Sequence, residues 1–220
     1  MQLIQDLAAE HDLIERVVGS LRRFVDERLK GEADPADGAR FVQFFRLFAG
    51  QYHHAREEDV LFVALREHAE LPGDRGPIKA ITDDRHEMAG MLDEIAQLLA
   101  TPLVLDLDRA RLETVARDYS HALWHHIDAE NSVLFPESQE RLRRHGIREL
   151  PGREMTQAER EARAVGEALV ARYAPLDDPT VIRGDGCVFC RVFGDGCAGI
   201  EHEWWNESEW DEFDARSQGL

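Results

Sequence analysis

The sequence predicts an all-α protein: an up-down-up-down four-helix bundle with an additional C-terminal helix and a short acidic tail rich in Cys and Trp. Three observations predict this fold. Apolar residues recur at intervals of three and four through most of residues 1–175, as on the buried face of an amphipathic helix. Only short turns separate the periodic segments, which favours antiparallel neighbours in a bundle. The chain contains no β-rich block.

The first two helices are joined by a turn over residues 31–38, which contains Asp34-Pro35. The second helix is expected from about Ala39 to Ala69, and residues 71–76 break it. The first helix is predicted from a stripe of apolar side chains that includes one histidine: Ile4, Leu7, His11, Ile14, Val18, Leu21 and Val25.

The third helix is expected to begin at Pro77, since the first turn of a helix accepts proline, and to end at Thr101-Pro102. Its apolar stripe contains Ile81, Met88, Leu92, Ile95 and Leu99. The fourth helix is expected to begin near Asp106 or Asp108 as the N-cap. Its stripe contains Leu112, Val115, Tyr119, Ala122, His126 and Val133.

The chain therefore divides into three predicted parts. Residues 1–150 form the bundle, and residues 151–179 form an additional helix and linker. The start of that helix is predicted from a capping box at Thr156 and Glu159, and its end at about Tyr173. Residues 180–220 form a tail that contains all three cysteines.

Composition excludes several classes of partner. The chain has 26 Lys and Arg against 44 Asp and Glu, and a formal net charge of −18. This balance argues against binding to nucleic acid or to an anionic membrane surface. We find neither a membrane-spanning segment nor the basic start of a signal peptide. Three cysteines fit a reducing compartment, so a cytoplasmic location is expected.

The strongest functional signal is a repeated motif. His53-x-x-x-Glu57-x-x-x-Leu-Phe on the second helix recurs as His126-x-x-x-Glu130-x-x-x-Leu-Phe on the fourth. A spacing of four places each His and Glu on one helix face. His11 lies in the stripe of the first helix, and imidazoles and carboxylates together favour a metal site. The predicted ligands of a two-ion centre are His11, His53, Glu57, His86, His126 and Glu130. Iron or manganese suits these ligands, zinc would bind as well, and positions remain for a small ligand.

Some of these assignments have alternatives. His54 and Glu58 have the same spacing as the chosen pair, but only the chosen frame matches the Leu-Phe of the other motif. His125 in the matching frame would pair with an alanine, so His54 and His125 are expected beside the site or on the surface. His86 flanks its apolar stripe, and a lone histidine such as His11 is also compatible with a purely structural role.

The two motifs resemble a known family. The segments 52–62 and 124–136 are similar to the signature stretches of hemerythrin-like (HHE cation-binding) proteins, and Glu10-His11-Asp12 and Arg85-His86-Glu87 resemble that family's other histidine sites. The resemblance covers about residues 1–150. It implies a four-helix bundle around a non-haem di-iron centre, bridged by two carboxylates and an oxo or hydroxo group. Family members bind dioxygen, sense oxygen, iron or nitric oxide, or handle peroxide.

Two departures from the oxygen-carrying members refine this expectation. Those members have a second histidine four residues after the first on the third helix, where this chain has Gly90. They also have Asp where this chain has Glu130. The missing imidazole favours redox, sensing or peroxide chemistry over simple oxygen carriage. The expected function is therefore to bind or react with O2, NO or H2O2, and whether the protein is an enzyme stays open. The alternative is a non-enzymatic iron-binding regulatory module whose metal loading controls stability and partner binding.

The tail carries a second signal. Cys187, Cys190, Cys197 and His202 offer three thiolates and an imidazole, which predicts one bound zinc ion. The alternatives are a redox-active dithiol and incidental cysteines. The acidic, Trp-containing end is a candidate surface for a protein partner.

Overall fold

The computed structural model describes residues 1–178 of the 220. The predicted zinc ligands Cys187, Cys190, Cys197 and His202, and the partner surface, lie outside the described residues. Those predictions therefore stay predictions.

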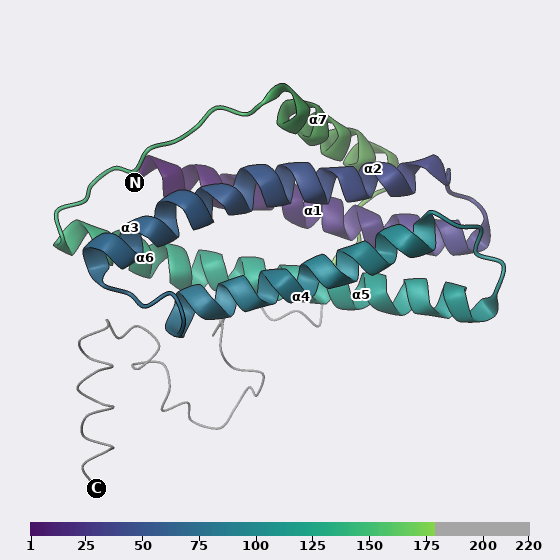
Figure 1. Ribbon diagram of the computed structural model, residues 1–220. Helices are drawn as coiled ribbons and strands as arrows, with labels where there is room; N and C mark the ends of the chain where they lie inside the picture. Colours follow the sequence, from purple (N-terminus) through teal and green to yellow (C-terminus); the bar gives the residue numbers. More distant parts are fainter. Residues whose placement is uncertain (179–220) are drawn as a thin grey trace, which may run out of the picture.

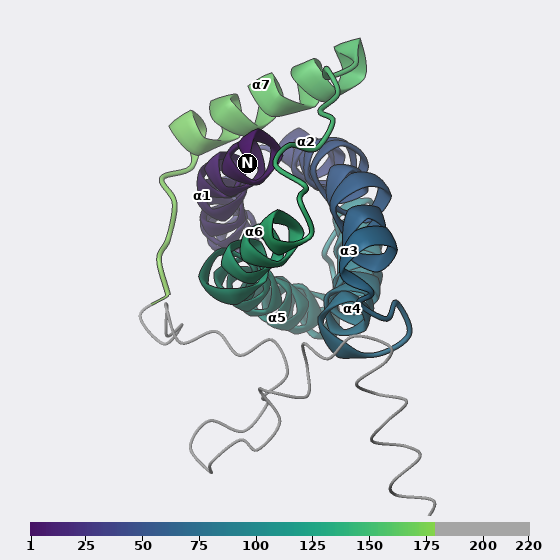
Figure 2. The ribbon, with the colours of Figure 1, turned by 90° about the vertical axis from the view of Figure 1, so that its left-hand side faces the viewer.

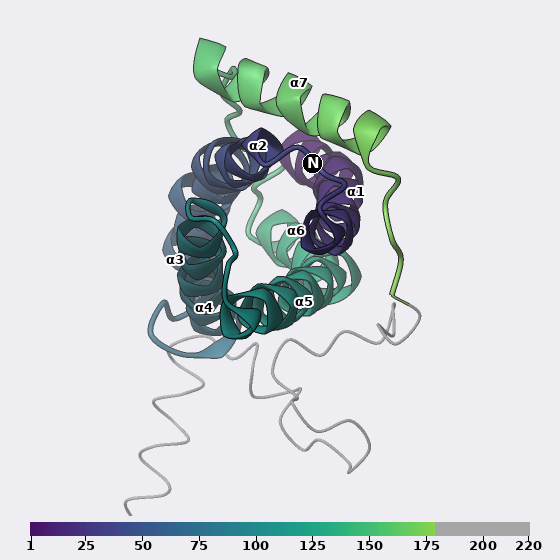
Figure 3. The same cartoon turned by 90° about the vertical axis from the view of Figure 1, so that its right-hand side faces the viewer.

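Four long helices surround a common interior, as expected from the apolar stripes (Figures 2 and 3). Consecutive long helices run in opposite directions along the bundle, and no strand occurs in residues 1–178 (Figure 1). The second and fourth long helices each consist of several consecutive elements. In chain order the elements are α1 (Gln2–Lys30), α2 (Ala36–Phe44), η1 (Phe45–His54), η2 (Glu57–Leu61), α3 (Phe62–Ala69), α4 (Gly76–Leu99), α5 (Asp106–Ala129), η3 (Glu130–Leu134), α6 (Phe135–Arg144) and α7 (Gln157–Arg172).

The elements labelled η are π-helical, and two of them begin at the repeated motif. Glu57 is the first residue of η2, and Glu130 is the first residue of η3. Both η2 and η3 end at the leucine of the motif's Leu-Phe pair. Short π segments within α-helices are frequent at functional sites. The sequence repeat is thus also a repeat of backbone conformation.

The helix boundaries follow the predicted turns with one correction. α1 is capped at its C-terminus by Gly31, whose φ of 80° lies in the left-handed region that glycine adopts without strain. The fourth long helix begins at Asp106, preceded by an extended Leu105 that makes no side-chain cap. The prediction of Asp106 or Asp108 as N-cap is therefore wrong. Both acids lie inside the first turn, where negative charge is favourable to the helix dipole.

The additional helix, α7, lies across α1 and α2 on the outside of the bundle (Figures 1 and 2). Its predicted capping box is confirmed, because the Thr156 hydroxyl accepts from the Glu159 amide and the Glu159 carboxylate accepts from the Thr156 amide. Beyond α7, the Leu176 amide donates to the Gly19 carbonyl at 3.0 Å. Ala162, Leu169 and Val170 of α7 belong to the same buried cluster as apolar residues of α1 and α2, so α7 extends the core of the bundle.

The buried apolar residues form two clusters along the bundle. The large cluster includes Phe24, Phe41 and Ile95, together with buried apolar residues of α7. The small cluster includes Leu65 and Leu134 near the other end. In α1, Leu7 belongs to the small cluster and Ile14 to the large one, with His11 between them. A layer of buried polar side chains therefore separates the two clusters.

None of the helices in residues 1–178 is long and apolar enough to span a bilayer.

Candidate metal centre

The polar layer contains six buried charged or titratable side chains from all four long helices: His11, His53, Glu57, Arg85, His126 and Glu130. Burying such groups is unfavourable unless they pair with one another or bind a metal. The contacts of these side chains therefore show whether they pair with one another or are arranged to bind a metal.

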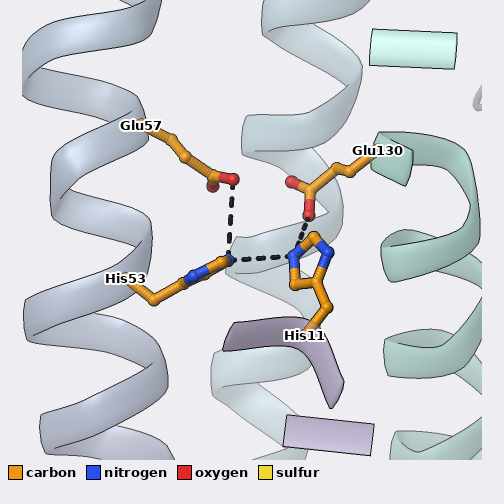
Figure 4. A group of neighbouring side chains, drawn as sticks. All are labelled: His11, His53, Glu57 and Glu130. Carbon is orange, nitrogen blue, oxygen red and sulfur yellow. Dashed lines mark hydrogen bonds and ion pairs between the residues drawn. The ribbon is translucent and has the colours of Figure 1, made fainter. Parts of the chain in front are cut away.

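Four of these residues converge on one point (Figure 4). His11, His53, Glu57 and Glu130 each offer one nitrogen or oxygen atom, and these atoms all lie within 4.8 Å of one another. The two Nε2 atoms are 3.0 Å apart, and Nε2 of His11 is 3.1 Å from Oε2 of Glu130. Nε2 of His53 is 3.6 Å from Oε1 of Glu57. The spacing suits a single metal ion placed among four ligands.

The other ring nitrogen of each histidine is already hydrogen-bonded. Nδ1 of His53 is 2.9 Å from Oε2 of Glu10, and Nδ1 of His11 is 2.8 Å from Oδ1 of Asn131. A carboxylate and an amide oxygen only accept hydrogen bonds, so we assign the ring hydrogen to Nδ1 in both histidines. Both Nε2 atoms then present lone pairs to the interior, an arrangement typical of metal-ligating histidines.

A cation fits this arrangement and resolves an otherwise unfavourable contact. Two imidazole lone pairs face each other and two carboxylates in a buried space. Oε1 of Glu57 and Oε2 of Glu130 are buried and make no hydrogen bond within the described chain. A metal ion at the point of convergence would satisfy all four donor atoms, and imidazole with carboxylate suits iron, manganese or zinc.

The ionisation states also favour a metal. Burial, together with the nearby His11 and His54, holds the pKa of His53 well below its usual value, so its imidazole is neutral as a ligand must be. Burial alone would raise the pKa of Glu130. The neighbouring His126, His11 and Arg85 outweigh that effect and hold the pKa of Glu130 well below its usual value. Glu130 is therefore an ionised carboxylate.

Arg85 of α4 lies against the opposite side of both carboxylates. Its Nη2 donates to Oε2 of Glu57 and, at 2.8 Å, to Oε1 of Glu130. Its Nη1 donates to Oε1 of Glu58 at 3.0 Å, and its Nε is 3.4 Å from Nε2 of His126. Burial lowers the pKa of Arg85, but a guanidinium paired with carboxylates stays charged.

The structure brings together four of the six predicted ligands and places the other two elsewhere. His126 is buried beside the cluster, with Nε2 3.0 Å from Oε1 of Glu130. His86 is exposed, which corrects its predicted place in the site. The reason is helical phase: Arg85 follows Ile81 by four residues and precedes Met88 by three, so it shares their buried face. His86 is rotated from that face by about 100°.

The two histidines left open by the sequence also differ. His54 is half-buried, with its ring 5.8 Å from that of His126, and burial lowers its pKa well below the usual value. His125 is exposed. His54 therefore lies beside the polar layer and His125 on the surface.

Three residues of the centre were not predicted from the sequence: Glu10, Arg85 and Asn131. The buried position of Arg85 could have been predicted, since this residue is in phase with the apolar stripe of its helix. Glu10 and Asn131 carried none beyond being next to a ligand, because their roles depend on contacts between helices.

Comparison with known proteins agrees with this geometry. A family model described as the hemerythrin HHE cation binding domain matches residues 2–138, a range that includes the four converging residues and Arg85. Neither a curated protein nor a solved structure gives a significant match.

Proposed function

Because the chain belongs to the hemerythrin HHE cation-binding domain family, we propose that its interior centre holds non-haem iron and binds a small ligand such as dioxygen, nitric oxide or peroxide. One observation supports this above all others. Two imidazole nitrogens and two carboxylate oxygens converge within 4.8 Å in the buried interior. Neither Oε1 of Glu57 nor Oε2 of Glu130 accepts a hydrogen bond from the described residues.

The donor set supports iron. Imidazole and carboxylate ligands with open coordination positions are typical of non-haem iron sites, whereas thiolates favour zinc and copper. Every cysteine of the chain lies in the tail, so the centre has none. Zinc and manganese remain substitutes that the same ligands accept.

The surroundings support a small, uncharged or singly charged ligand. Four protein donors leave positions free on an ion that prefers six. The large and small apolar clusters lie on either side of the polar layer and exclude bulky or strongly solvated molecules. In this arrangement Glu10 and Asn131 hold the ring hydrogens of His53 and His11, so that both Nε2 atoms stay available to the metal.

The proposal is tested by metal analysis and by azide binding. Protein purified without chelator and without added metal should contain iron, and azide added to the oxidised protein should produce a new charge-transfer band. His53→Gln should lose the iron. The control His86→Gln makes the same change at an exposed histidine and should retain it.

Two results would contradict the proposal in different ways. A wild-type protein with no transition metal would remove the metal centre. Iron without any spectral response to azide would remove the small ligand, and would leave the alternative of an iron-loaded regulatory module.

A further inference from the structure

In each of the two buried carboxylates, Glu57 and Glu130, the two oxygens contact different groups. Oε1 of Glu57 and Oε2 of Glu130 face the pair of histidines. Oε2 of Glu57 and Oε1 of Glu130 both accept from Nη2 of Arg85. Two carboxylates that bridge a pair of positions in this way are suited to two neighbouring cations.

We propose that only one of these positions takes a metal ion, and that the guanidinium of Arg85 is the second cation. The metal lies with His11 and His53, while Arg85 occupies the position expected for a second iron. This inference depends on the proposed function for the metal itself. It replaces the expectation of two irons with a centre of one metal and one arginine.

The contacts of Arg85 leave no ligand set for a second ion. The groups nearest to that position are the outward carboxylate oxygens of Glu57 and Glu130 and Nε2 of His126. Arg85 donates to both oxygens, and its Nε is 3.4 Å from that nitrogen. A second metal would have to displace the guanidinium from every one of these groups.

The balance of charge supports the same count. The two buried carboxylates carry two negative charges, and Arg85 offsets one of them. A single divalent ion then leaves these groups with one excess positive charge, which the carboxylate of Glu58, 3.0 Å from Nη1 of Arg85, helps to offset. A second divalent ion beside the arginine would add two further positive charges in a buried space, which is strongly unfavourable.

Arg85 is also held firmly in place. It lies on the buried face of α4 between Ile81 and Met88, with its guanidinium carbon 5.3 Å from the centre of the Phe62 ring. Its Nη1 has a further partner in Glu58. The other buried arginine among residues 1–178, Arg56, pairs with Glu10 outside the carboxylate pair and leaves the centre unchanged.

The test is a count of bound metal combined with its magnetic state. Metal-free full-length protein is loaded with excess Mn²⁺, passed through a desalting column and analysed for manganese per chain. Electron paramagnetic resonance then distinguishes an isolated Mn²⁺ ion, which gives six hyperfine lines, from a spin-coupled pair. We expect one Mn²⁺ per chain in the wild type, with the isolated signal.

Variants of Arg85 test its role as the excluding cation. Arg85→Ala should bind about two Mn²⁺ per chain with a coupled signal, whereas the matched control Arg85→Lys keeps the positive charge and should bind one. His126→Gln should leave the single ion of the wild type in place, and should abolish the second ion in the Arg85→Ala background.

The outcomes separate the inference from the proposed function. Two Mn²⁺ per wild-type chain would overturn the inference and leave the metal centre standing, a result that does not depend on any variant folding. No Mn²⁺ and no iron in the wild type would overturn both. A single ion in folded Arg85→Ala would also overturn the inference, because the arginine would then not be what excludes the second metal.

Discussion

The hydrogen bond between Glu10 and His53 should control the affinity of the metal centre. Nδ1 of His53 donates to the Glu10 carboxylate at 2.9 Å, with both side chains largely buried. A charge-assisted bond of this kind contributes about 1.5–3 kcal/mol. It also fixes the tautomer that directs Nε2 at the metal. Each 1.4 kcal/mol is a factor of ten in Kd, so Glu10→Ala should weaken metal binding about 10- to 100-fold.

The assay is a competition titration of metal-free protein against a chromophoric chelator, with zinc as a probe that does not change oxidation state. Asp6→Ala is the matched control, since it removes the same charge from an exposed position on the same helix. Arg56→Met is a second control. It removes the ion pair of Glu10 with Arg56 and leaves the bond to His53 intact, so the affinity should stay at the wild-type level or increase.

Zinc affinity of Glu10→Ala within twofold of the wild type would refute this role of the hydrogen bond. The same loss in Asp6→Ala would refute it equally, because the effect would then come from net charge and not from the hydrogen bond.

Three further predictions concern stability. Glu130→Gln should abolish most of the rise in melting temperature that added metal gives the wild type, because an ion that binds only the folded state stabilises that state. An unchanged rise in differential scanning fluorimetry would place the metal elsewhere. In Gly166→Ala the new Cβ would lie 2.4 Å from two ring carbons of the fully buried Phe44, so the free energy of unfolding in urea should fall by about 1–3 kcal/mol, and a gain would contradict the packing of α7. The hydrogen bonds from Arg153 lower the pKa of Glu159 to about 2, so this carboxylate stabilises the fold fully above its ordinary pKa of 4.5 and ceases to do so as the pH falls towards 2. Glu159→Gln should therefore be less stable than the wild type by roughly 1–2 kcal/mol at pH 7, allowing for solvent screening, with the difference shrinking below pH 4.5; a difference independent of pH would contradict this.

The fold could be predicted from the sequence because its helices depend on apolar periodicity, a local property. The stripe of α1 is buried along its whole length, and the capping box of α7 is formed as predicted. The π-helical segments could not be predicted in this way. A π segment changes backbone hydrogen bonding over a few residues and leaves the apolar pattern around it almost the same.

The site could be predicted where its signal was repeated and not where it depended on helical phase. The two His-x-x-x-Glu motifs predict that Glu57 and Glu130 lie close together, as they do, whereas His126 of the same repeat lies beside the converging group. On α4, the chemistry of His86 suggested a ligand, whereas the phase of the helix buries Arg85. Because buried arginines are rare, residue type favoured His86 as the buried residue, whereas apolar periodicity favoured Arg85. The structure agrees with the periodicity.

We also expect the polar layer to divide the folding of the bundle into two cooperative units. The large cluster has the support of α7, while the small cluster joins the beginning of α1, α3, the beginning of α4, and α6. Regions with fewer buried contacts open at a lower free energy than the whole molecule. We therefore expect that, without metal, the end of the bundle around Leu65 and Leu134 opens while the rest stays folded. An ion bound by residues of three long helices joins the two units, because opening either one then breaks the centre. Metal occupancy of the polar layer should therefore determine whether the protein unfolds in parts or as a whole.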